Sequence, residues 1–448
     1  MTHPLIADCP AQRHATLEFQ SPDEIRRVQD ELLVQHVRYA AQHSPFYRER
    51  FLQAGLDPAG VRGIDDLAGL PCTEKADLTE RNEDFLAVPP EEIVDVCLTS
   101  ATTGTTPTQL LQTAGDLARL AYNEQQAFGM LGVGPSTTLL VGAALDRCFM
   151  AGLAYFLGAV RLGARAVRAG AGSEAQHWQT IRATHPDTIM CVPSLMRRIA
   201  EKVIEMGEDP REAGIRRLIG IGESTRDASL ALLPAGQKIE ELWGATLYST
   251  YASTEIAATF CECRERLGGH LRAELLVVEI LDEENRPVAE GELGEVVVTP
   301  LGVQGMPLIR FRTGDISYRM DSPCACGRNT PRLAPIVGRK NQMLKYKGTT
   351  LFPNTLLAAL EGREDVQGVF VEAHRNPDGT DRVVACVALR DGIRPEQVMD
   401  SLCEQMRAYA RVVPEIEFVS PEIFEQRVHQ SGKRKRVTFH DFRNETQG

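Results

Sequence analysis

The chain has 448 residues, 43% of them hydrophobic and 25% charged, and this length exceeds what one hydrophobic core usually supports, so we expect at least two domains. Its 49 basic and 61 acidic residues give a net charge of −12, which argues against a nucleic-acid partner bound through phosphate neutralisation. Because no apolar run suits a signal peptide or a bilayer span, we expect a cytoplasmic protein without membrane contact.

The first predicted element is an amphipathic helix over residues 21–39. It opens on Ser21-Pro22-Asp23-Glu24, a spacing typical of a helix start with proline at the first position. Further along, short apolar runs alternate with helical stretches, which predicts βαβ units and a parallel sheet. The strands predicted for this sheet are 137–145, 164–169, 188–194, 216–222 and 244–250.

The pattern changes near residue 271, where two apolar runs around a polar turn predict antiparallel strands at 275–281 and 291–299. A later pair of apolar runs flanks the turn Asn376–Thr380, which is a hairpin signal. A helix over 395–410 and a strand over 415–419 follow this hairpin.

These elements predict an α/β fold in two parts. Residues 1–338 form a large N-terminal region with mixed and parallel sheets flanked by helices, including a small β subdomain at about 271–337. Residues 339–448 form a small α+β C-terminal domain, within the usual size range of domains.

The stretch Thr99–Thr108, TSATTGTTPT, combines hydroxyl side chains with one glycine. Backbone N–H groups and hydroxyls of such a loop can converge on a phosphate, and Gly104 supplies conformational freedom. No lysine follows the glycine, so the loop is not a Walker P-loop. A polar surface turn is the alternative interpretation of this stretch by itself.

Four further segments follow the loop along the chain, in this order: YASTE at 251–255, FRTGD at 311–315, GR at 338–339 and SGK at 431–433. Together with the loop, this set resembles the adenylate-forming superfamily of acyl-CoA synthetases, peptide-synthetase adenylation domains and luciferases. Within it, segments such as PTQLLQTAGD, GMPLIRFRTGD and CACGRNTPRL resemble the phenylacetate-CoA ligase branch. The loop departs from the family pattern, with Ala101 in place of the first glycine.

The resemblance implies a nucleotide site. In it, Thr254 contacts phosphate, Glu255 holds Mg²⁺ and Asp315 accepts hydrogen bonds from the ribose. Tyr251 stacks on the adenine, and it also faces the acyl substrate. The remaining residues expected to bind the nucleotide are Thr102, Thr103, Gly104, Gly222, Glu223, Ser224, Ala252, Ser253 and Arg339. Considered alone, Glu255 and Asp315 could equally be surface carboxylates.

The resemblance also implies catalysis by a mobile C-terminal domain. Lys433 bridges the carboxylate substrate and the α-phosphate, and Asn341 lies at the hinge of the domain rotation. Thr254 and Glu255 complete the catalytic set. Phe149 forms part of the acyl pocket wall, although packing in a helix core explains this residue as well.

Eleven cysteines include two Cys-x-Cys pairs, Cys261/Cys263 and Cys324/Cys326. Cys263, His270, Cys324 and Cys326 make a Cys₃His set, typical of closed structural zinc sites. Cys261 is the spare thiol and could replace Cys263. Reduced thiols on turns are the alternative.

The function that the resemblance implies is an AMP-forming carboxylate–CoA ligase that uses ATP, Mg²⁺ and CoA. The acid is expected to be aromatic or arylalkanoic, and the partners are small molecules, with a possible homodimer. An adenylating enzyme that transfers the acyl group to a carrier protein or an amine is the first alternative. A nucleotide-binding regulatory protein without catalysis is the second.

Overall fold

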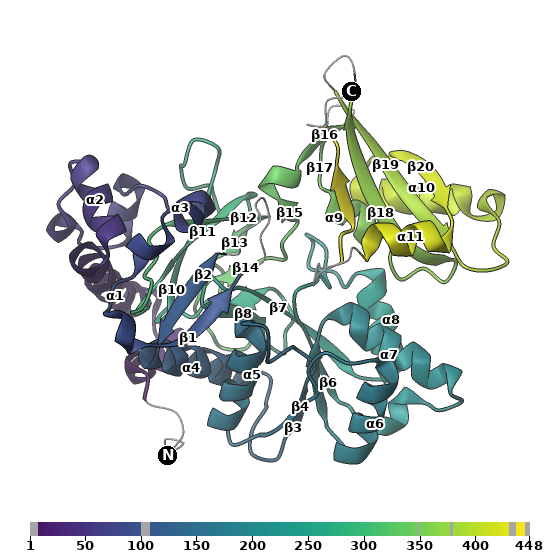
Figure 1. The fold of residues 1–448 in the computed structure, drawn as a ribbon, viewed down its shortest axis with the longest axis horizontal. Coiled ribbons are helices and arrows are strands. Elements are labelled where there is room, and N and C mark those ends of the chain that lie inside the picture. Colours follow the sequence, from purple (N-terminus) through teal and green to yellow (C-terminus); the bar gives the residue numbers. More distant parts are fainter. Residues whose placement is uncertain (1–7, 100–107, 347–348, 377–379, 430–435, 444–448) are drawn as a thin grey trace. The chain divides into compact units, whose positions relative to one another are not determined.

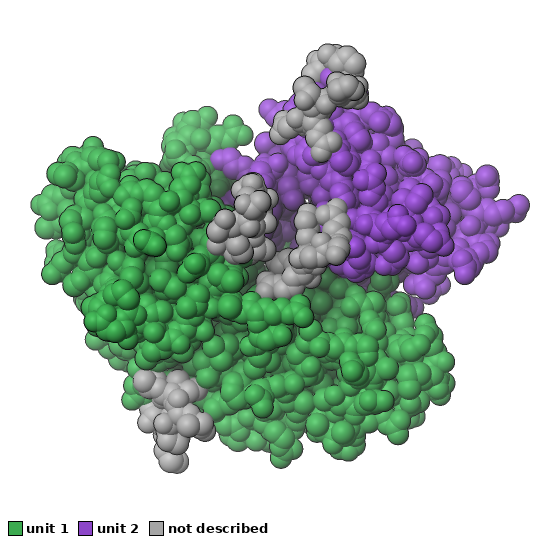
Figure 2. All heavy atoms as spheres, in the orientation of Figure 1, with its two compact units in different colours: residues 1–223, 240–313, 317–335 green, residues 224–239, 314–316, 336–448 purple. Residues whose placement is uncertain are grey.

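The computed structural model describes residues 8–99, 108–346, 349–376, 380–429 and 436–443. The chain divides into two compact units (Figure 2). Unit 1 comprises residues 1–223, 240–313 and 317–335, and unit 2 comprises residues 224–239, 314–316 and 336–448. The division into domains at residue 338 stays a proposal. The predicted mixed α/β fold is confirmed.

Unit 1 contains a nine-stranded sheet in the order β13-β14-β9-β8-β7-β6-β5-β3-β4. Its parallel half runs from β7 to β4, and its strands are β3 (Thr138–Val141), β4 (Arg165–Arg168), β5 (Thr188–Cys191), β6 (Arg217–Gly220) and β7 (Thr246–Ser253). The helices that follow these strands are α5 (Met150–Arg161), α6 (Glu174–Thr184), α7 (Pro193–Glu205) and α8 (Pro234–Trp243) (Figure 1). Strands β3 and β5 are buried along their whole length, as strands covered on both faces should be. The predicted βαβ series is confirmed.

The other half of this sheet is antiparallel and consists of β8 (Ala258–Glu262), β9 (Gly269–His270), β14 (Arg332–Leu333) and β13 (Arg319–Met320). Strand β7 pairs with β6 through residues 246–249 and with β8 through residues 250–253. The carboxyl end of β7 therefore extends past the parallel half and turns back into β8.

A second sheet contains the strands predicted after residue 271. Strands β10 (Leu276–Leu281) and β11 (Gly294–Pro300) pair in antiparallel register, which confirms that prediction. Strand β12 (Phe311–Ser317) follows, and its residues Asp315 and Ile316 pair with β15 (Gly338–Arg339).

The segment Thr99–Thr108 joins two antiparallel strands, β1 (Ile93–Leu98) and β2 (Gln109–Thr113). Helix α4 (Ala114–Met130) starts only after β2, where the Thr113 hydroxyl accepts from the backbone N–H of Asp116. The N-terminal helices are α1 (Pro22–His43), α2 (Pro45–Gln53) and α3 (Lys75–Glu80), and Ser21 caps α1 as predicted.

Unit 2 contains a four-stranded sheet in the order β20-β19-β18-β21 between two helical layers. Helices α9 and α10 share one core with Val369, Val371 and Val383, while α11 packs Phe424 against Phe370 on the other face. Its elements are β16 (Leu344–Tyr346), β17 (Thr349–Leu351), α9 (Pro353–Leu360), β18 (Val366–Arg375), β19 (Asp381–Leu389), α10 (Pro395–Ala410), β20 (Glu415–Val419), α11 (Pro421–Val428) and β21 (Phe439–Asp441). Strands β18 and β19 form the predicted hairpin.

Within the described residues, none of the helices combines the length and the apolar character that a membrane span requires.

Helix α4 buries a carboxylic acid in unit 1. Glu124 is 2% exposed, and its Oε1 accepts from the Thr259 hydroxyl (2.5 Å) and from Asn123 Nδ2 (2.9 Å). Its Oε2 has no hydrogen-bond partner in the described part of the chain. Burial raises the pKa of Glu124 from 4.5 to about 7, because the ionised form loses its hydration.

This raised pKa makes part of the stability dependent on pH. From about pH 4.5 to 7 the unfolded chain releases the Glu124 proton while the folded chain keeps it, so the contribution of Glu124 to stability falls as pH rises. Glu124→Gln cannot ionise, so its melting temperature relative to wild type should be higher at pH 8 than at pH 5. Parallel melting profiles of the two proteins across this range would contradict the assignment.

Candidate functional site

The YASTE segment of unit 1 covers the last three residues of β7 and the first two residues of the turn that leads to β8. Tyr251 is paired with Phe260 and Ser253 with Ala258 across the two strands. The Ser253 hydroxyl accepts from the backbone N–H of Ile256 (3.3 Å). The turn thus holds Thr254 and Glu255 at the carboxyl end of β7, while Ala252 is exposed.

Glu255 already has a cationic partner. Its side chain is 8% exposed, and Lys75 Nζ of α3 lies 3.4 Å from Glu255 Oε1. A carboxylate at this position can hold a hard cation such as Mg²⁺. Lys75 could not be predicted as a site residue, since a lysine in the first turn of a short helix resembles any surface residue.

A pocket with about 410 Å³ of empty space, part of it open to solvent, lies beside this turn. Thr254, Glu255, Asp116 and Arg119 contribute polar groups to it. Its other lining residues come mainly from β2, α4, α5 and the segment between β11 and β12: Leu110, Leu111, Gln112, Leu120, Met150, Ala257, Pro300, Val303, Met306 and Leu308. Phe149 and Tyr251, the residues predicted to contact the acyl group, are not among them.

Phe149 precedes α5 and is partly buried against the core around β3 and β5. Its neighbour Met150 reaches the pocket.

Gly222 and Glu223 follow β6 at the same end of the parallel strands. Gly222 has φ +71°, a conformation that glycine adopts without steric cost. The Glu223 carboxylate accepts from the backbone N–H (2.8 Å) and the hydroxyl (2.6 Å) of Ser194, at the start of α7. A carboxylate at a helix N-terminus is favourable, so the Glu223 side chain has a structural role.

Unit 2 holds the predicted ribose-binding residues. Asp315 is 7% exposed and lies opposite Arg339 in the pairing of β12 with β15. Arg339 Nε lies 3.2 Å from Asp315 Oδ1. Ser224 donates a long hydrogen bond to the carbonyl of Ile336 (3.5 Å).

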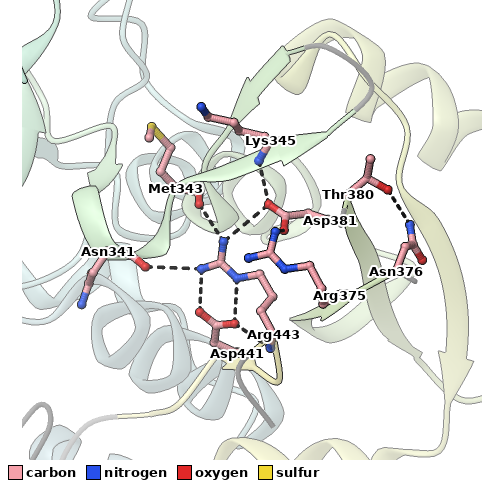
Figure 3. A network of polar contacts seen from close by, with 9 residues as sticks. All are labelled: Asn341, Met343, Lys345, Arg375, Asn376, Thr380, Asp381, Asp441 and Arg443. Carbon is pink, nitrogen blue, oxygen red and sulfur yellow. Dashed lines mark hydrogen bonds and ion pairs between the residues drawn. The ribbon is translucent and has the colours of Figure 1, made fainter. Parts of the chain in front are cut away.

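The predicted hinge residue Asn341 is tied to the end of the chain through Arg443 (Figure 3). Arg443 donates to the carbonyls of Met343 (3.0 Å) and Asn341 (3.4 Å), and pairs with Asp441 (2.6 Å). The same guanidinium reaches buried Asp381 (3.5 Å), which also accepts from the backbone N–H of Lys345. Residues 341–345 are therefore anchored on the body of unit 2.

The four predicted zinc ligands come together in unit 1. The ligand atoms of Cys263, His270, Cys324 and Cys326 all lie within 4.8 Å of one another. The sulfurs of Cys263 and Cys324 are 3.7 Å apart, and Cys326 Sγ is 3.5 Å from His270 Nε2. Two sulfurs bound tetrahedrally to zinc at about 2.3 Å would be about 3.8 Å apart, so the cluster fits this ion.

The protonation of His270 and Cys326 suits a metal, whereas burial raises the pKa of the Cys263 thiol to about 12. Burial and the nearby Arg328 lower the pKa of His270 to about 3, which keeps the ring neutral, as coordination requires. Burial opposes ionisation of Cys326, but hydrogen bonds from Arg328 lower the pKa of this thiol overall. Cys261, the alternative ligand, is buried in the core around β3 and β5 and lies outside the cluster.

Thr102, Thr103, Gly104 and Lys433 lie outside the described residues. Their assignments stay predictions, as do the other roles expected in nucleotide binding and catalysis.

The chain is similar in sequence and in fold to known adenylate-forming ligases. The family model of AMP-binding enzymes matches residues 14–304, more than half of the chain. The phenylacetate-coenzyme A ligase of Thermus thermophilus is 32% identical over 77% of each chain, and that of Pseudomonas putida is 28% identical over 89% of this chain and 91% of its own. The crystal structure of 2-hydroxyisobutyryl-CoA ligase in the postadenylation state shares the fold, with a TM-score of 0.82, 24% identity, and coverage of 96% of this chain and 91% of the other.

Proposed function

This chain belongs to the AMP-binding enzyme family, in its phenylacetate-CoA ligase-like branch, and on that premise we propose that it is an AMP-forming carboxylate–CoA ligase. The observation that carries the proposal is the 32% identity to a phenylacetate-coenzyme A ligase over 77% of both chains. The substrate we propose is an aromatic or arylalkanoic acid.

The reaction has two steps. In the first, a carboxylate oxygen attacks the α-phosphorus of ATP, the new P–O bond gives an acyl adenylate, and pyrophosphate leaves. In the second, the thiol sulfur of CoA attacks the acyl carbon, a thioester forms, and AMP leaves with the electron pair of the broken C–O bond. Both steps bring anions together, so the site must neutralise negative charge.

Residues of both units contribute to this scheme. In unit 1, Glu255 would hold Mg²⁺, which would neutralise phosphate charge, and Thr254 would donate to phosphate. Tyr251 stacks on the adenine, with Gly222, Glu223, Ala252 and Ser253 along the nucleotide. In unit 2, Asp315 accepts from the ribose, supported by its proximity to Arg339 (3.2 Å). Thr102, Thr103, Gly104 and Ser224 add nucleotide contacts, Lys433 bridges the reacting groups, and Asn341 lies at the hinge.

The acyl group requires an apolar environment. The pocket beside Glu255 has an apolar side that includes Leu120, Met150 and Met306, which supports an acid with an apolar body. Phe149, next to Met150, is proposed as a further wall of the acyl site.

We also propose that Cys263, His270, Cys324 and Cys326 hold a structural zinc ion. His270 lies on β9, which pairs with β8 before Cys263 and with β14 after Cys326, so the four ligands connect three short strands of the large sheet. With four protein ligands the site is closed, and its role is to hold these strands together.

The ligase proposal is tested by pyrophosphate release with a panel of carboxylic acids, with and without CoA. Phenylacetate or a related aryl acid should release pyrophosphate in the presence of ATP and Mg²⁺, and CoA should be converted into a thioester. Product formation only with an amine or a carrier protein would favour a non-CoA acceptor. A complete lack of acid-dependent pyrophosphate would sink the proposal.

Lys433→Ala separates the two steps. Loss of this cation should slow adenylate formation about 10²–10³-fold, by analogy with the loss of a preorganised oxyanion donor. Thioester formation from a supplied acyl adenylate should stay near the wild-type rate. Lys435→Ala, two residues further on, is the matched control for the loss of one charge. Equal losses in both steps would count against the assignment of Lys433.

The proposed zinc site is tested by elemental analysis of purified protein. Wild type should contain about one zinc per chain, and Cys324→Ser should contain much less and melt at a lower temperature, because the ion links strands that are only two residues long. Cys261→Ala removes a buried thiol outside the cluster and should keep the metal. Wild-type protein free of metal, with a melting temperature that a chelator leaves unchanged, would refute the site.

A further inference from the structure

Helix α4 carries a buried arginine, Arg119, that has no role in the ligase scheme described above. Arg119 is 3% exposed and lines the pocket beside Glu255. Its guanidinium donates to three backbone carbonyls: Nε to Leu301 (2.7 Å), Nη2 to Leu275 (2.6 Å) and Nη1 to Ala257. Charge-assisted bonds of this kind are shorter and stronger than those between neutral groups.

The bond to Ala257 matters because of where this residue lies. Ala257 ends the turn that carries Thr254 and Glu255, directly before β8. Its φ is +49°, in the left-handed region that residues with a β-carbon rarely adopt. Such a conformation persists only where the surrounding structure enforces it, and such residues concentrate at functional sites. Arg119 supplies that constraint by holding the Ala257 carbonyl.

The same stretch of α4 also holds the segment after β11, which contributes Val303 and Met306 to the pocket. Asp116, one turn before Arg119, accepts from the backbone N–H groups of Gln304 (2.8 Å) and Gly305 (2.9 Å). Arg119 holds the carbonyl of Leu301 in the same segment. One helix thus binds both the turn with Glu255 and the segment at 301–305, next to other residues that line the pocket.

We propose that Arg119 is a positioning residue for adenylate formation: it keeps the strained β7–β8 turn in the conformation in which Glu255 would hold the metal and Thr254 would contact phosphate. This inference rests on the proposed ligase function. The planar guanidinium group of an arginine can donate to three separate carbonyls. The ammonium group of a lysine is a compact point charge and suits this arrangement less well.

The test compares steady-state kinetics of pyrophosphate release for wild type and Arg119→Met. Misplacement of a positioning group by about 1 Å can cost about 10²-fold in rate, so kcat/KM for ATP·Mg²⁺ should fall by about that factor. The Mg²⁺ concentration for half-maximal rate should rise. Arg119→Lys, a milder change for the case in which the methionine variant does not fold, should show the same shifts to a smaller extent.

Arg310→Met is the control for loss of a buried arginine. Arg310 is 2% exposed, binds Glu279 and the carbonyl of Leu70, and is not among the residues that line the pocket. This variant should lower the melting temperature but leave the Mg²⁺ dependence unchanged. If Arg119→Met and Arg119→Lys behave like this control, with normal kinetics and only a lower melting temperature, the positioning role is refuted.

A double-mutant cycle with Ala257→Gly tests the link to the turn. Glycine adopts φ +49° without steric cost, so the turn needs less support from Arg119 in this background. The loss in kcat/KM caused by Arg119→Met should therefore be smaller in Ala257→Gly than in wild type. Equal losses in both backgrounds, within about twofold, would show independent sites and overturn the inference. Failure of wild type itself to release pyrophosphate would instead refute the ligase function.

Discussion

The arrangement of unit 1 depends on one constraint, the common carboxyl edge of its parallel strands. Strands β3, β5, β6 and β7 pair in parallel, so their carboxyl ends meet at one edge of the sheet, where open α/β folds bind ligands. Phe149, Ser194, Gly222–Glu223 and Thr254–Glu255 all follow one of these strands. Residues far apart in the sequence, such as Met150 and Thr254, thereby line one pocket.

Periodicity in the sequence was sufficient for the long elements and failed for the short ones. The buried β-branched runs of β3 to β7 and the alternating strands of the β18–β19 hairpin each carry a clear pattern. Strands β9, β13 and β14 have two residues each, too few for any period, so their place in the large sheet could not be predicted. For the same reason residues 271–337 appeared as one β subdomain, although β13 and β14 join the nine-stranded sheet.

The residues of the candidate sites were likewise predictable only where the sequence has a distinctive pattern. Cys263, His270, Cys324 and Cys326 were identifiable because cysteine and histidine at such spacings are rare, and the pairing of β9 with β8 and β14 then brings them together. Lys75 and Arg119 carry no such signal. Arg119 donates to the carbonyls of residues 257, 275 and 301. Every residue has a backbone carbonyl, so such hydrogen bonds cannot be recognised from the sequence.

Two ion pairs, one in each unit, would limit the cost of binding the charged nucleotide that we propose. Glu255, the proposed Mg²⁺ ligand, lies 3.4 Å from Lys75, and Asp315, the proposed ribose acceptor, lies 3.2 Å from Arg339. A buried carboxylate without a partner would be neutralised by a raised pKa, since an isolated ion is poorly solvated inside a protein. Each of these carboxylates faces a cationic side chain of its own unit before any ligand arrives. Binding is then an exchange of partners at carboxylates that have already lost most of their water.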